Sequence, residues 1–172
     1  MVVLKSKIFI PRHYKKGDEK SLQKNINDKD IYRYTLRIPY PYKSKDAKKF
    51  IKNSINQYKK RKKTEIKFAI DIDGEVVGGV GFMNIEKHKA EIGYWLSRKY
   101  WNKGIMTKAV RLVTNFGFNK LKLRRIQAGI FSKNKSSARV LQKNGYKFEG
   151  LMKKYHLKDG KLIDALLYAK TK

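Results

Sequence analysis

The chain has 172 residues, enough for one domain spanning 1–172 and too few for two domains with separate cores. Hydrophobic residues make up 41% of it and cysteine is absent, so a buried core is available, while disulfides, thiolate metal sites and thiol nucleophiles are excluded. The net charge of +29 favours phosphate-bearing ligands, nucleic acid or an acidic protein surface as partners, although a general enrichment in lysine would give the same balance.

The histidines and the apolar residues exclude two further classes of protein. The three histidines are widely spaced, which argues against a histidine metal site, and no metal is expected. Lys5 and Lys7 interrupt the first residues, which therefore lack the long apolar run of a secretory signal. No stretch approaches the roughly 18 apolar residues of a membrane span. We expect a soluble, cytoplasmic domain with no membrane partner.

The first third of the chain predicts a strand and two helical regions. Residues 2–10 are rich in Val, Ile and Phe and predict an opening strand, and residues 18–34 show a loosely helical spacing of apolar residues. Two prolines exclude a regular helix over 38–42. Residues 44–60 place apolar side chains on one helical face and lysines on the other, which predicts an amphipathic helix that ends in a basic run.

The middle of the chain predicts three antiparallel strands. Residues 65–72 and 75–83 are rich in β-branched and aromatic residues and flank Asp73-Gly74, a strong hairpin signal. Glycines in the second run indicate a bulge, or a place where another backbone or a ligand comes close. Residues 90–97 predict the third strand, joined by a turn near Glu86–Lys89.

The remaining residues predict two helices and three strands. Apolar residues at three- and four-residue steps predict an amphipathic helix over 105–118, followed by a strand over 124–132. A short helix follows, which Asn134 caps and Gly145 ends. Residues 146–158 and 161–170 predict the last two strands, and the turn Asp159-Gly160 joins them in a hairpin. This order predicts an α+β domain with mixed α/β layers.

The segment Tyr100–Thr107 lies between a predicted strand and a strongly amphipathic helix. A glycine-containing turn at a helix N-terminus gathers unpaired N–H groups and the positive end of the helix dipole, so it can hold a pyrophosphate, with Lys103 adding a full charge. The segment matches neither the Walker A pattern nor the dinucleotide-binding fingerprint. A strand, glycine turn and helix are also an ordinary connection, so this signal is weak by itself.

Two further motifs stand at fixed distances from this turn: the strand Ala90–Leu96 (AEIGYWL) and the block Asn134–Gly150. Together the three motifs resemble the GNAT superfamily of N-acetyltransferases, and within it the ribosomal-protein N-terminal (alanine/serine) acetyltransferase group. The resemblance implies a sheet of about seven mostly antiparallel strands with flanking helices. It also implies acetyl-coenzyme A as cosubstrate, bound where two adjacent parallel strands splay apart.

The resemblance also implies which residues bind acetyl-coenzyme A. The strand end would offer backbone hydrogen bonds to the pantetheine arm, the helix mouth would wrap the pyrophosphate, and the second motif would lie near the thioester and the outer part of the molecule. The strand-end residues are Leu96, Ser97 and Arg98. The residues of the helix mouth are Asn102, Lys103, Gly104, Ile105, Met106 and Thr107. Those of the second motif are Asn134, Arg139 and Lys143. Asn102 and Met106 depart from the wider superfamily, where smaller residues or arginine are frequent at these positions.

Acetyl transfer needs a base for the amine, a backbone N–H at a strand irregularity for the oxyanion, and a proton donor for the thiolate. Glu91 is the first candidate base, with pairing to a lysine as the alternative role. Many GNAT enzymes carry a donor tyrosine where this chain has Leu141, whereas the ribosomal-protein group has a serine that Ser137 matches, with helix capping as the alternative role. That group has a glutamate where His156 stands here, beside Tyr155, so His156 is a second candidate base or a sign of a different acceptor.

A third carboxylate and several aromatic residues are further candidates for the same site. Asp164 is a carboxylate in register to face it, or a partner for arginine or a backbone amide. For the aromatic residues Tyr94, Trp95 and Trp101, core packing is favoured over stacking on nucleotide bases. Two tyrosines in the proline-flanked loop, Tyr40 and Tyr42, are better placed for acceptor contact.

The leading functional hypothesis is acetyl transfer to a protein N-terminal α-amine, that of a ribosomal protein included. Polyamine and antibiotic amines are alternatives, and the cationic surface disfavours polyamines. A different class is a basic RNA- or ribosome-binding protein on the same scaffold, because residues 43–63 contain ten Lys or Arg and one acid. The chain alone leaves monomer and homodimer both open.

Overall fold

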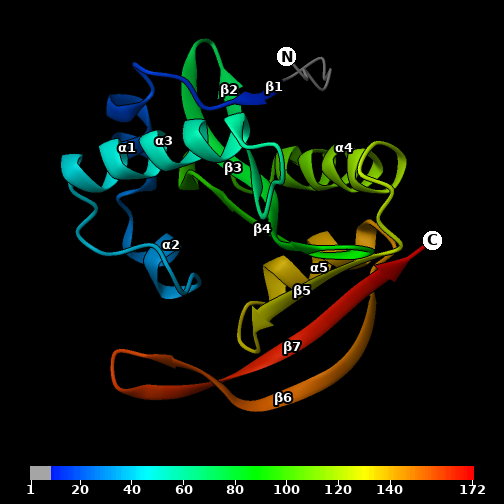
Figure 1. Cartoon of the computed structure of the whole chain (residues 1–172). Coiled ribbons are helices and arrows are strands. Elements are labelled where there is room, and N and C mark those ends of the chain that lie inside the picture. The colour runs from blue at the N-terminus through cyan, green and yellow to red at the C-terminus, as the bar shows by residue number, and fades with distance from the viewer. Residues whose placement is uncertain (1–8) are drawn as a thin grey trace.

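The computed structural model describes residues 9–172, and these form one mixed sheet with helices packed on both of its faces (Figure 1). The strands are β1 (Ile10–His13), β2 (Ile66–Ile72), β3 (Glu75–Glu86), β4 (Lys89–Leu96), β5 (Arg125–Phe131), β6 (Lys147–Lys158) and β7 (Lys161–Thr171). The helices are α1 (Glu19–Ile26), α2 (Lys29–Arg33), α3 (Ser44–Lys59), α4 (Ile105–Asn119) and α5 (Lys135–Lys143), with a 3₁₀ turn at Arg98–Tyr100.

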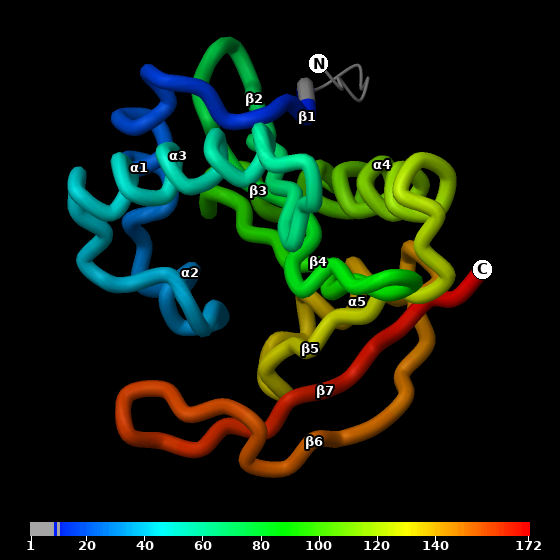
Figure 2. Tube along the Cα trace, in the orientation of Figure 1, coloured from blue at the N-terminus to red at the C-terminus, as the bar shows by residue number. Residues whose placement is uncertain are grey.

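The sheet has seven strands in the order β1-β2-β3-β4-β5-β7-β6, and every neighbouring pair is antiparallel except β4 with β5. The parallel pair is joined over only three residue pairs, the last of them Glu91 with Gln127. Beyond that point β4 pairs only with β3, and β5 pairs only with β7. Figure 2 shows the two traces starting together and then separating. The sheet is therefore split at its centre, as the resemblance implied.

Two tight hairpins follow directly from local sequence. At Asp73-Gly74 the φ angles are 52° and 81°, and at Asp159-Gly160 they are 50° and 71°. Positive φ at both central residues is the geometry whose twist matches antiparallel strands, and Asp-Gly adopts it at low cost. Both predicted hairpins are confirmed.

Alternating side chains of the strands build two apolar clusters on opposite faces of the sheet. Phe68, Val80 and Phe82 pack with α4 and α5 on one face, while Ala69 and Val76 pack with α1, α2 and α3 on the other. Successive strand residues point to opposite faces, so neighbours such as Phe68 and Ala69 enter different clusters. This arrangement explains the amphipathic patterns of α3 and α4.

The glycines of β3 are explained by crowding and by a bulge. The register between β2 and β3 shifts after Ile70, which leaves Val77 as the extra residue beside Gly78. A Cβ on Gly81 would lie 2.8 Å from the Cα of Lys67, closer than real contacts allow. The predicted bulge and close backbone approach are both present.

The other predicted elements are confirmed within a few residues at their ends. The exception is the opening strand, which was expected over 2–10: β1 runs from Ile10 to His13, and residues 2–8 lie outside the described part of the chain. The loosely helical stretch 18–34 forms two short helices, because Asp28 accepts hydrogen bonds from the N–H groups of Asp30 and Ile31 and starts a new helix there. Among residues 9–172, no helix has the length and hydropathy required to cross a membrane.

Candidate active site

The mouth of α4 opens beside the split in the sheet. Asn102 and Gly104 have φ angles of 60° and 72°, and both are exposed. Within residues 9–172, no carbonyl or side chain accepts a hydrogen bond from the N–H of Ile105, Met106 or Thr107. No heavy atom lies within 4 Å of the place where a Gly104 Cβ would stand. Free N–H groups and the positive end of a helix dipole at an uncovered surface form a site suited to a phosphate group.

The β4 edge that faces the split offers further backbone donors. The Ser97 N–H donates to the Val77 carbonyl of β3 at 2.8 Å, so the N–H of Leu96 points the other way, toward the split. The Leu96 carbonyl accepts from the Trp101 indole N–H at 2.7 Å. Of the residues named for the pantetheine arm, Ser97 therefore has its N–H already engaged, while that of Leu96 is directed at the split.

The expectation of a donor at a strand irregularity needs correction. The register of β4 on β3 is regular from Leu96 opposite Gly78 to Glu91 opposite Met83, without a bulge. The free N–H groups arise because β5 leaves β4, and each one that would have paired with β5 then faces the split.

On the α4 and α5 face of the sheet, Tyr94 and Ser137 form a hydroxyl pair. The Tyr94 Oη lies 2.7 Å from the Ser137 Oγ, and Ser137 is 8% exposed. The Ser137 N–H donates to the Asn134 Oδ1 at 3.1 Å, so Asn134 caps α5 and fixes the serine in its first turn. Burial raises the pKa of Tyr94 above its ordinary value, and Tyr94 therefore stays protonated.

On the opposite face, the structure brings together the two candidate bases. Ala90 and Ile92 enter the α4 cluster, so Glu91 between them faces the α1–α3 side. Burial lowers the pKa of His156, the charge of Glu91 raises it and that of Arg37 lowers it. Two charged groups, Glu91 and Arg37, thus act on the His156 pKa besides burial, and its net shift is downward, which favours the neutral imidazole.

Two further candidate residues, Asp164 and Tyr155, lie on the β6–β7 hairpin. Asp164 Oδ1 accepts from the Lys154 N–H at 2.7 Å, within a bulge of β6 where Lys154 has a φ of 52°. Asp164 thus serves a backbone amide, one of the two roles open for it. Tyr155 lies in the same bulge, is 57% exposed, and its ring centroid is 4.8 Å from that of His156.

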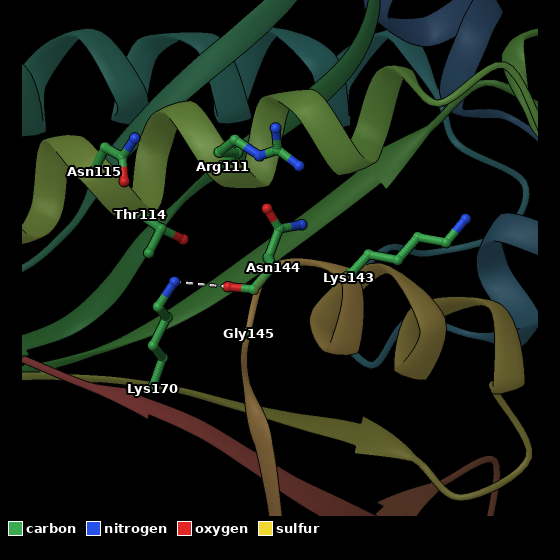
Figure 3. Close-up of a pocket in the computed structure, with 7 residues that line it drawn as sticks. All are labelled: Arg111, Thr114, Asn115, Lys143, Asn144, Gly145 and Lys170. Atoms are coloured by element: carbon green, nitrogen blue, oxygen red, sulfur yellow. Dashed lines mark hydrogen bonds between the residues drawn. The ribbon is translucent and has the colours of Figure 1, made fainter.

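A cationic pocket of about 360 Å³ lies between the later turns of α4, the C-terminal end of α5 and the end of β7 (Figure 3). Arg111, Lys143 and Lys170 line it, and Lys170 donates to the Asn144 carbonyl at 2.7 Å. The Asn144 amide donates to the Thr107 carbonyl at 3.1 Å, which connects this pocket to the mouth of α4. Arg139, also named for acetyl-coenzyme A, is exposed on α5.

The structure also places Leu141 and the two tyrosines of the proline-flanked loop, Tyr40 and Tyr42. Leu141 is fully buried in the core, and the hydroxyl beside Ser137 comes from Tyr94 on β4. Tyr42, expected at an acceptor surface, is 5% exposed and packs in the α1–α3 cluster, where burial raises its pKa to about 12. Tyr40 is exposed, with its ring centroid 6.0 Å from that of Tyr32.

Sequence reasoning missed that the β6–β7 hairpin is tied to α2. Lys158 Nζ donates to the Thr35 carbonyl at 2.6 Å and to the Tyr32 carbonyl, and the Tyr32 hydroxyl donates to Asp159 at 2.5 Å. These residues are more than 100 positions apart, and no local pattern pairs them. The contacts connect the two elements that flank the Glu91 face.

A mixed sheet that splits between two parallel strands, with an open helix mouth beside the split, defines the class of acyl-coenzyme A-dependent N-acyltransferases. Residues 10–147 match the acetyltransferase (GNAT) domain family, and the chain belongs to this family. Its members transfer acetyl groups from acetyl-coenzyme A. Among residues 9–172, no group of three or more His, Cys, Asp or Glu side chains is placed to hold a metal ion.

Some sequence relatives name no acceptor, and AaaT names an L-amino acid. The probable N-acetyltransferase YjcK of Bacillus subtilis (strain 168) is 38% identical over 107 residues, 58% of this chain and 59% of YjcK. The chain aligns with 56–59% of the length of this and two other Bacillus N-acetyltransferases. The L-amino acid N-acetyltransferase AaaT of Escherichia coli (strain K12) is 26% identical over 169 residues, 95% of this chain and 98% of AaaT.

The fold is also that of a solved acetyltransferase structure. RimL, a ribosomal L7/L12 alpha-N-protein acetyltransferase in complex with coenzyme A, superposes with a TM-score of 0.89 at 22% identity. The superposition covers 99% of this chain and 98% of that one. At this identity the likeness shows the fold.

Proposed function

We propose that this protein transfers the acetyl group of acetyl-coenzyme A to a primary amine, and that its acceptor is a protein N-terminal α-amine of the ribosomal-protein type. The observation that carries the proposal is the split between β4 and β5 beside the free N–H groups of Ile105–Thr107. A sequence relative, the ribosomal protein uS5-alanine N-acetyltransferase of Escherichia coli (strain K12), is 31% identical over 100 residues, which supports the acceptor class.

The residues present fit the cosubstrate, which when bound supplies an activated acetyl thioester. The N–H groups of Ile105, Met106 and Thr107 and the ammonium of Lys103 would hold its diphosphate. The Leu96 N–H would bind the pantetheine arm along the open β4 edge. Lys143 and the pocket it lines would hold the phosphorylated outer part.

Proton transfers would then take place from the two faces of the split. The neutral amine nitrogen bonds to the thioester carbonyl carbon as the carbon–sulfur bond breaks, giving an amide and coenzyme A thiol. Glu91 or His156, on one face, accepts the proton that the amine loses. Ser137, on the other face and bonded to Tyr94, donates a proton to the leaving sulfur.

The flanks of the Glu91 face favour a slender acceptor. The contacts of Lys158 and Asp159 with α2 hold the hairpin against the helical side of this face. A chain terminus or a small amine is narrower than a lysine displayed on a folded surface. This feature supports an N-terminal α-amine, and it also accommodates a free amino acid, the acceptor named for AaaT.

The test is incubation with acetyl-coenzyme A and three acceptor sets: N-terminal peptides beginning with Ala or Ser, free L-amino acids, and polyamines. Thiol release and mass spectrometry of the products report turnover. We expect acetylated peptide with stoichiometric coenzyme A. If only free amino acids are acetylated, the proposed acceptor, a protein N-terminus, is wrong. Absence of coenzyme A binding by calorimetry would overturn the enzymatic proposal.

A further inference from the structure

The segment 43–63 is about twice as rich in cations as the chain around it. Ten of its 21 residues are Lys or Arg, against 43 of 172 in the whole chain. Its single acid, Asp46, is engaged at the start of α3, where its carboxylate accepts from the Lys43 N–H at 2.8 Å. General lysine enrichment therefore does not account for this density.

The lysines of α3 form one stripe on its outer face. Lys45, Lys48, Lys49, Lys52 and Lys59 are all exposed and recur at three-, four- and seven-residue steps. At 1.5 Å per residue the stripe is about 21 Å long. The opposite side of α3 packs into the α1–α3 cluster through Ala47 and Ile51, so the stripe faces solvent. We call these five side chains the α3 stripe.

The charges of the segment are not neutralised within the described residues. None of the ion pairs formed among residues 9–172 includes a cation from 43–63. Acidic residues elsewhere do pair with basic ones, for example Glu149 with Arg125. The stripe thus presents its full charge to solvent.

The chemistry of the stripe distinguishes among anionic partners. A helix that binds a membrane surface inserts apolar side chains, whereas four apolar residues of α3 pack in the core (Ala47, Phe50, Ile51, Ile55) and the Tyr58 ring, 38% exposed, stacks on His13. A protein interface is anchored by apolar or aromatic residues, and lysine is depleted at its centre. A row of ammonium groups without such anchors fits the regularly spaced phosphates of a nucleic acid.

We infer that the α3 stripe is a nucleic-acid-binding surface that contacts the phosphate backbone without reading sequence. It lies on a different element from β4, α4 and α5, which build the candidate active site. Binding through the stripe and acetyl transfer at the split are therefore separable by mutation.

The experiment measures binding of fluorescein-labelled 16-base-pair RNA and DNA duplexes to the full chain by anisotropy, from 50 to 300 mM salt. The test variant is Lys48→Gln/Lys49→Gln/Lys52→Gln. The control is Lys120→Gln/Lys122→Gln/Lys147→Gln, which removes the same charge from exposed lysines outside α3. A Lys→Arg triple at 48, 49 and 52 keeps the charge. Melting temperature and coenzyme A binding verify that each variant is folded.

We expect the wild-type affinity to fall steeply with salt, and the test variant to lower the slope of log K against log salt by about two and to weaken binding about tenfold at low salt. The control should weaken binding less than threefold, and the arginine triple should bind like wild type. The duplexes decide whether RNA or DNA is preferred. Equal losses in both glutamine triples, no duplex binding, or tighter binding to phosphatidylglycerol vesicles would overturn the inference.

Discussion

The hydroxyl of Tyr94 lies 2.7 Å from the hydroxyl of Ser137, on the face of the sheet opposite to Glu91 and His156. The split where β5 leaves β4 lies between these two faces. A thioester lying in that split would have candidate bases on one side and a protonated hydroxyl pair on the other. The split therefore separates the two proton transfers in space.

Replacing Ser137 by alanine is expected to lower kcat about 10²-fold while leaving the KM for acetyl-coenzyme A within about threefold, because general acid catalysis contributes on that scale. Tyr94→Phe should lower kcat less, since it removes only the group that orients the serine. Steady-state kinetics by thiol release measure both. The control is Tyr146→Phe, which removes a tyrosine hydroxyl from another buried pair, 2.8 Å from Thr114, and should keep kcat. Full activity in Ser137→Ala would exclude a catalytic role for the serine.

The environment of His156 predicts how activity depends on pH. Burial lowers the pKa of folded His156 below the ordinary value, so the neutral base persists to lower pH. For the same reason His156 contributes folding stability that is present above its unfolded pKa and is lost as the pH falls. Arg37→Gln removes a charge that lowers the pKa, so the acidic limb of kcat/KM should move to higher pH. His156→Gln should abolish that limb and keep the limb from the acceptor amine. An acidic limb that does not move in Arg37→Gln would count against His156 as the base.

Gly104 has a left-handed backbone at the mouth of α4, with open space around it. Gly104→Ala should cost about 1 kcal/mol of folding free energy and weaken coenzyme A binding several-fold, because relief of the strain moves the N–H groups that follow. Gly74→Ala introduces the same kind of strain, at a φ of 81°, in the β2–β3 turn. That variant should lose similar stability and keep coenzyme A affinity in calorimetry. Equal affinity losses would mean that strain alone weakens binding.

Arg12 ties the first strand to the sheet through two carboxylates. Its guanidinium bonds both oxygens of Asp18 at 2.8 Å and Asp71 at 2.7 Å, and Asp18 is 3% exposed. Arg12→Ala should lower the free energy of unfolding by about 3 kcal/mol, because it leaves a buried carboxylate uncompensated. Lys24→Ala breaks the exposed pair with Glu75 and should cost less than about 1 kcal/mol. Urea denaturation measures the free energy of unfolding of both variants. Equal losses would contradict the larger contribution assigned to Arg12.

Much of the fold could be predicted because it depends on short stretches of sequence. Asp73-Gly74 and Asp159-Gly160 determine their hairpins through backbone preferences of two residues, and the spacing of apolar residues in 44–60 and 105–118 determines which faces of α3 and α4 are buried. The α4 mouth was predictable for the same reason, since a glycine before an amphipathic helix leaves its first N–H groups free.

The partners of side chains within the site were not predictable in this way. The sequence favoured core packing for Tyr94, and Tyr94 does pack against the core, but its hydroxyl also reaches Ser137, 43 residues further along. Tyr42 belongs to a polar, proline-flanked loop and is nevertheless buried. Asp164 supports a bulge that exists only because β6 and β7 pair out of register.

The sequence by itself determined the elements, their order and the backbone donors at Gly104, because these follow from interactions among residues close in the chain. Only the tertiary structure decided where the sheet splits, that Glu91 and His156 share one face, and that Tyr94 and Ser137 share the other. Such relationships depend on how strands distant in sequence pack and diverge, and no periodicity within one segment encodes them.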